Sequence, residues 1–141
     1  MGKLTNNKDC FCDGEAALLL DRKGRRYLVN LSSDQIFHSH LGRLSHDQLI
    51  DHTVGGWYRT DRGHTVLAVR PTLGDSVREM PRGPQIIYPK DLGNIITFGD
   101  IFPGATVVEG GLGSGSLTSA LLRAVGDRGR VITYEIDESV L

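Results

Sequence analysis

The feature that most constrains this chain is a glycine-rich loop between a short apolar run and an amphipathic segment. The loop reads Glu-Gly-Gly-Leu-Gly-Ser-Gly over residues 109–115, directly after Val107 and Val108. Glycine permits backbone angles and close approaches that other residues do not. The first amides of the following helix would lack partners within the helix. A strand that leads through such a loop into a helix therefore predicts a binding site for a nucleotide-type cofactor.

The residues after the loop complete a β-α-β unit. Apolar side chains recur at helical spacing from Leu117 to Val125, and Gly126 stands where a helix C-cap belongs. Residues 131–134 predict a second buried strand, and Glu135 stands at its end. An acid about 20 residues past the loop is placed to accept hydrogen bonds from the hydroxyls of a ribose.

Both NAD and S-adenosylmethionine carry such a ribose. A dinucleotide favours Gly-x-Gly-x-x-Gly, whereas Gly111, Gly113 and Gly115 are spaced two residues apart. Glu109, at the end of the first strand, would repel a phosphate but suits the cationic end of S-adenosylmethionine. The loop thus favours a methyltransferase over a dehydrogenase. A tight turn without any ligand is the third explanation, and Glu135 at the expected offset weakens it.

The residues before the loop predict a separate β module. Residues 1–14 are polar and predict a disordered or frayed tail. Residues 15–71 predict a small β domain with hairpins near 18–31 and 57–69 and a strand at 36–40. Ser45 resembles the cap of a short helix that would continue through Ile50.

Two connecting helices are expected over residues 72–104. Thr72 would cap the first, and Pro89 would begin the second, which would carry Leu92, Ile95 and Ile96 inward. The run Pro-Arg-Gly-Pro at 81–84 predicts a joint between the modules.

Residues 105–141 hold the β-α-β unit, so the expected fold class is a small N-terminal β domain followed by the start of an α/β Rossmann-like methyltransferase domain. A doubly wound sheet needs more strands than two. We therefore expect a fragment, a truncated open reading frame or a piece that needs a partner, in which about half of the sheet is missing.

Charge and cysteine content exclude several classes of protein. Sixteen Lys and Arg face seventeen Asp and Glu, so no global basic field indicates a nucleic-acid binder. A local basic cluster lies in a predicted turn, where a solvated tip is the commoner explanation; its members are Arg22, Lys23, Arg25 and Arg26. No apolar run approaches the roughly 20 residues of a membrane span, and two cysteines in a Cys-x-Cys pair suit reduced thiols and a cytoplasmic location.

A zinc site is the metal alternative. His38 and His40 share a predicted strand face, and Cys10 and Cys12 would have to join them. Because nothing in the sequence brings the tail to that strand, we expect no metal and regard the histidine pair as a hydrogen-bonded structural feature.

Several motifs together strongly resemble the tRNA (adenine-58-N1) methyltransferase family of the bacterial and archaeal type. They are Phe-His-Ser-His-Leu-Gly at 37–42, Leu-Ala-Val-Arg-Pro-Thr at 67–72, Met-Pro-Arg-Gly-Pro-Gln-Ile-Ile-Tyr-Pro-Lys-Asp at 80–91 and Asp-Ile-Phe-Pro-Gly at 100–104, followed by the glycine loop. The resemblance runs from about residue 15 to the end.

The resemblance implies S-adenosylmethionine as methyl donor, N1 of an adenine in the tRNA T loop as acceptor, and a homotetramer. It also implies which residues contact the cofactor. Beside Glu109, Gly111 and Gly113 from the motif, these are Ser114, Gly115, Ser116, Leu117 and Glu135, with Gln85 and Tyr88 lining the same pocket.

The sequence departs from the family in the loop and in its extent. Gly110 replaces the usual alanine, and Leu112 replaces a small residue, so its side chain either crowds the pocket or points away. The family's catalytic aspartate lies on a later strand, so no catalytic residue is assigned and we expect the 141 residues alone to be inactive. The alternative function is a non-catalytic RNA-binding or assembly module, against which the intact glycines and Glu135 argue.

Overall fold

The computed structural model describes residues 9–80 and 85–138 and divides the chain into two compact units, Met1–Pro71 and Thr72–Leu141. The change of unit falls between Pro71 and Thr72. The joint predicted at 81–84, the first eight residues of the predicted tail and the last three residues of the chain lie outside the described residues.

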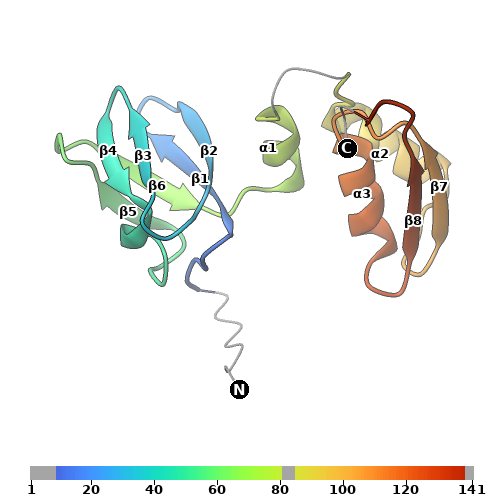
Figure 1. Cartoon of the computed structure of the whole chain (residues 1–141), viewed down its shortest axis with the longest axis horizontal. Helices are drawn as coiled ribbons and strands as arrows, with labels where there is room; N and C mark the ends of the chain where they lie inside the picture. The colour runs from blue at the N-terminus through green and yellow to red at the C-terminus, as the bar shows by residue number, and fades with distance from the viewer. Residues whose placement is uncertain (1–8, 81–84, 139–141) are drawn as a thin grey trace. The chain divides into compact units, whose positions relative to one another are not determined.

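The first unit is built on a four-stranded antiparallel sheet (Figure 1). Its strands are arranged in the order β2 (Arg26–Asn30), β1 (Ala16–Asp21), β6 (Thr65–Val69) and β5 (Gly56–Arg59). Both predicted hairpins are therefore confirmed. Tyr27, Val29 and Leu31 pack against one core, as their alternation predicts.

A third hairpin, β3 (Ile36–Ser39) with β4 (Gly42–Ser45), contributes to the same core through Leu44, which is fully buried. The sequence predicts only the strand at 36–40 in this region, so β4 is an additional strand. Ser45 caps a short 3₁₀ helix, His46–Gln48, as its sequence indicates, but the helix ends two residues before Ile50, where it was expected to end.

Residues 9–14 do not form the frayed tail that their polarity predicts. Phe11 has no exposed surface and belongs to the core of the first unit, and it pairs with Ile50 while Cys10 pairs with Thr53. Arg70 donates to the carbonyl of Cys10 and lies over the Phe11 ring at 5.9 Å from its centroid. Burial of one aromatic ring thus outweighs the polarity of its neighbours.

The second unit begins with α1 (Leu73–Arg78), whose N-terminus is closed by a capping box between Thr72 and Asp75. The helix α2 (Pro89–Phe98) starts at the predicted proline. Of its three residues expected to point inward, Leu92 is buried, but Ile95 is 36% exposed. Val77 on α1, Leu92 on α2 and Ala120 share one small core.

The β-α-β unit consists of β7 (Thr106–Gly110), α3 (Ser116–Val125) and β8 (Arg130–Tyr134), with the two strands parallel (Figure 1). Helix α3 buries Ala120, Leu121 and Val125, and Gly126 is its C-cap, as the spacing predicts. The second strand is less buried than predicted. Tyr134 on this strand, β8, is 67% exposed, and Val108 on the first strand, β7, is exposed to the same extent.

Candidate functional site

The glycine loop lies at the carboxyl end of β7 and begins α3. Gly111, Gly113 and Gly115 have φ angles of 87°, 53° and 75°, in the left-handed region that disfavours side chains. Gly115 is the N-cap of α3. Gly110 has an ordinary φ, and a Cβ there would meet no atom within 4 Å, so the alanine usual at this position would fit.

Glu135 holds the loop from the end of β8. Its Oε2 accepts hydrogen bonds from the amides of Leu112 at 2.7 Å and Gly113 at 3.2 Å. Its Oε1 accepts from the amides of Ile136 at 2.8 Å and Asp137 at 3.0 Å. These donors, the amide of Asp137 foremost and that of Gly113 next, lower the pKa of Glu135 to about 2.

Glu109 is the buried carboxylate of the site, at 5% exposure. Its Oε2 accepts hydrogen bonds from the hydroxyls of Thr118 at 2.6 Å and Thr133 at 2.8 Å. Its Oε1 is buried and has no hydrogen-bond partner among the described residues. A buried acceptor without a donor is costly, so this oxygen suits a cationic or N–H-bearing ligand group.

The segment before α2 forms the remaining wall. The amide of Ile87 donates to Ser116 Oγ at 3.0 Å, and Ser114 Oγ donates to the carbonyl of Gln85 at 3.4 Å. These bonds tie residues 85–87 to the start of α3.

The walls enclose a pocket of about 290 Å³. Eight of the ten predicted site residues line it: Gln85, Glu109, Gly111, Gly113, Ser114, Ser116, Leu117 and Glu135. Gly115 and Tyr88 are not among the lining residues, and Tyr88 is the 49% exposed N-cap of α2. Leu112, Ile87 and Gly110 also line the pocket.

Sequence reasoning missed the two threonines that hold Glu109. Thr118 lies on α3 and Thr133 on β8, whereas Glu109 lies on β7, so the three side chains come from three different elements of the β-α-β unit. No periodicity marks them, because only the fold brings them to one carboxylate.

The described residues contain no group of three or more His, Cys, Asp or Glu side chains that could hold a metal ion. Cys10 and Cys12 are free thiols. His40 instead shares a hydrogen bond of 3.3 Å with the hydroxyl of Tyr27. In the part of the chain that is described, no helix has the length and apolar character needed to cross a membrane.

Glu135 makes a pH prediction possible. Its pKa in the folded chain, about 2, lies below the ordinary value of 4.5, so its stabilising contribution is present above pH 4.5 and is lost as the pH falls toward 2. We expect the amide resonances of Leu112 and Gly113 to titrate with a midpoint near pH 2 in an NMR pH series. A midpoint near 4.5, or identical titration in Glu135→Gln, would contradict this assignment.

Two family profiles match the chain. The profile described as "tRNA methyltransferase complex GCD14 subunit" matches residues 64–140, and that described as "TrmI-like N-terminal" matches residues 10–56. The junction of unit 1 and unit 2 at Pro71 lies just inside the first of these matches.

The curated relatives that match the chain are also named as tRNA methyltransferases. A protein of Thermus thermophilus named tRNA (adenine(58)-N(1))-methyltransferase TrmI is 44% identical over 84% of this chain and 46% of its own length. A protein of Methanocaldococcus jannaschii named tRNA (adenine(57)-N(1)/adenine(58)-N(1))-methyltransferase TrmI is 41% identical over 84% of this chain and 41% of its own length. The chain spans less than half the length of these two relatives.

Solved structures confirm the fold class. A Thermotoga maritima structure titled SAM-dependent O-methyltransferase superposes with a TM-score of 0.86 at 31% identity, covering 99% of this chain and 52% of that one. The tRNA (m1A58) methyltransferase TrmI of Aquifex aeolicus superposes with a TM-score of 0.71 at 28% identity, covering 94% and 50%. A β-rich N-terminal region followed by part of an α/β methyltransferase fold is therefore established.

Proposed function

Because the chain belongs to the family of the tRNA methyltransferase complex GCD14 subunit, we propose that it is the amino-terminal part of an S-adenosylmethionine-dependent enzyme that methylates N1 of adenine 58 in the tRNA T loop. The observation that carries the proposal is the pair of carboxylates at the glycine loop. Glu109 presents a buried oxygen that has no hydrogen-bond partner in the described part of the chain, and Glu135 stands at the end of the second strand. The names of the relatives supply the reaction and its substrate.

The proposed cofactor fits this donor set. Glu109 Oε1 would face the ammonium of the amino-acid part, since that group brings the donor and the positive charge that the oxygen lacks. Glu135 would accept from the ribose hydroxyls. Gly111, Gly113, Ser114, Gly115, Ser116 and Leu117 would hold the nucleoside close to the main chain, with Gln85 and Tyr88 at the rim. When bound, the cofactor supplies an electrophilic methyl group.

The acceptor chemistry requires groups beyond this pocket. N1 of adenine must be reached by taking the base out of its loop, and the methylated base must then lose a proton from its amino group. The only acids that line the described pocket are Glu109 and Glu135, which the cofactor would engage. We therefore assign no catalytic residue.

The proposal extends to the partners. We propose tRNA as substrate, a homotetramer as assembly and the cytoplasm as location. Light scattering of the purified protein tests the tetramer, since a 15.4 kDa chain gives well-separated masses for one and four copies.

A titration calorimetry experiment tests cofactor binding. We expect S-adenosylmethionine to bind with a dissociation constant on the order of micromolar and NAD not to bind, because Glu109 would lie beside a phosphate of the dinucleotide. Binding of NAD alone would contradict the proposal. Absence of binding by both ligands to a folded chain would favour the alternative, a non-catalytic RNA-binding or assembly module, which the word "complex" in the family description leaves open.

A further inference from the structure

The first unit has a pocket of its own at the β1–β2 turn, with a volume of about 350 Å³. Its described lining comes from three separate segments of the unit: Asp21, Arg22, Lys23, Arg25, His40, Leu41, His64 and Thr65. We call it the basic-turn pocket. The surface that lines the pocket is mostly carbon, and seven of its eight residues, all but Leu41, also carry a polar or charged group.

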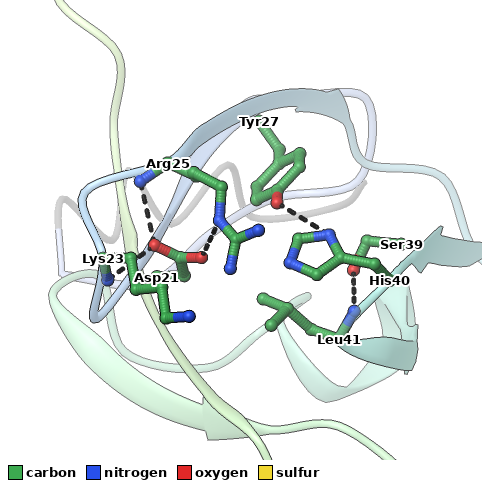
Figure 2. Close-up of polar contacts among 7 residues, drawn as sticks. All are labelled: Asp21, Lys23, Arg25, Tyr27, Ser39, His40 and Leu41. Atoms are coloured by element: carbon green, nitrogen blue, oxygen red, sulfur yellow. Dashed lines mark hydrogen bonds and ion pairs between the residues drawn. The ribbon is translucent and has the colours of Figure 1, made fainter.

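The turn that forms one wall is fixed by a single carboxylate. Asp21 Oδ1 accepts from the amides of Lys23 and Arg25, both at 2.8 Å, and Oδ2 accepts from Arg25 Nε at 2.6 Å (Figure 2). Gly24 allows the tight turn with a φ of 77°. Because Asp21 is bound three times within the turn, the main chain of the turn and the side chain of Arg25 are held before any ligand arrives.

The charges in the pocket do not balance. Arg22, Lys23 and Arg25 face one lining carboxylate, Asp21, which leaves an excess of two positive charges even with neutral histidines. Arg22 and Lys23 are exposed, and their side chains make no hydrogen bond or ion pair with the described residues. Solvation at the tip of a turn is enough to explain why Arg22 and Lys23 are exposed. It does not explain why these two cations line one pocket together with Arg25 and two histidines.

His40 adds a directed donor. Tyr27 Oη lies 3.3 Å from His40 Nδ1 (Figure 2). When the hydroxyl donates to Nδ1, the neutral ring carries its proton on Nε2, and Figure 2 shows this second nitrogen on the side of the ring that faces Arg25. The bond from Arg25 to Asp21 uses Nε, so the terminal guanidinium nitrogens lie outside it.

We propose that the basic-turn pocket binds a phosphodiester group of the RNA backbone, with Arg22, Lys23 and Arg25 supplying charge and His40 a hydrogen bond. A guanidinium fork and a nearby N–H donor match the oxygens of a phosphate. Such a contact positions the RNA without reading its sequence. The inference rests on the proposed function, since that function makes RNA the partner.

The test compares two double variants that remove the same charge. Arg22→Gln/Lys23→Gln changes the pocket, whereas Arg59→Gln/Arg128→Gln removes two exposed cations that do not line it. Binding of an unmodified tRNA transcript is measured by fluorescence anisotropy from 50 to 200 mM salt. We expect the pocket variant to bind about tenfold more weakly and to lower the slope of log affinity against log salt by about 1–2. We expect the control to change affinity less than twofold.

Three outcomes would overturn the proposal. Equal losses in both double variants would show a general charge effect, and unchanged binding in the pocket variant, or no binding by the wild type, would show that this pocket does not hold RNA. Circular dichroism melting verifies that both variants fold. Titration of S-adenosylmethionine into the same preparations separates failure of this inference from failure of the proposed function, since the cofactor site lies in the other unit.

Discussion

Replacement of Phe11 by alanine is expected to lower the free energy of unfolding of the first unit by about 3–5 kcal/mol, because the substitution empties a fully buried aromatic site. Phe11 packs in the core that includes Leu19 and Leu44 and anchors the pairing of residues 10 and 11 to the segment 50–53. Urea denaturation followed by circular dichroism measures the change.

The matched control is Phe98→Ala. Phe98 ends α2 in the second unit and is 87% exposed, so the same chemical change is expected to cost less than about 0.5 kcal/mol. Trp57, the only tryptophan, lies in the first unit and reports on that unit separately by fluorescence. If Phe11→Ala were no more destabilising than Phe98→Ala, the segment 9–14 would not be part of the folded unit.

Phe11 also shows what the sequence could not predict. It stands between two cysteines in a polar stretch without a hydrophobic period, and its partner in the core, Ile50, is 39 positions away. Helix α3 was predictable for the opposite reason. Its apolar residues repeat at the helical period and a glycine ends them, so local pattern and burial agree.

The strand β4 illustrates a second limit. Gly42, Arg43, Leu44 and Ser45 offer one apolar residue in four, which is too little alternation to distinguish a strand from a turn. The strand forms because its main chain pairs with β3 and Leu44 reaches the core. For Ile95 the prediction of burial was wrong for the opposite reason: its apolar side chain fits the helix period, yet it is 36% exposed.

The candidate site was more predictable than the fold around it. The glycine loop and Glu135 follow each other within one β-α-β unit, so sequence spacing fixes their neighbourhood. Spacing could not show that Glu135 accepts hydrogen bonds from the amides of Leu112 and Gly113. Nor could it show that Thr118 and Thr133 bind one oxygen of Glu109 while the other has no partner among the residues that the structure describes. These details depend on the directions of side chains, which the spacing of residues in the sequence does not give.

Glu135→Ala is expected to weaken S-adenosylmethionine binding by about 100-fold, since a hydrogen bond to a charged group contributes about 1.5–3 kcal/mol and a ribose offers two hydroxyls. The carboxylate already accepts four amide hydrogen bonds, as many as its lone pairs allow. A ribose hydroxyl must therefore replace at least one amide. Titration calorimetry at constant pH measures the change, with Glu138→Ala as the control because Glu138 is exposed and outside the pocket.

Two explanations of such a loss can be separated. Glu135 acts either on the ribose directly or through the shape of the loop that it holds. A direct contact predicts that wild type binds S-adenosylmethionine about tenfold more tightly than its 2′-deoxy analogue and that Glu135→Ala binds both alike. An effect through the loop predicts equal weakening for the two ligands. Unchanged affinity in Glu135→Ala would remove this residue from the cofactor site and leave Glu109 as the one carboxylate among the described residues that line it.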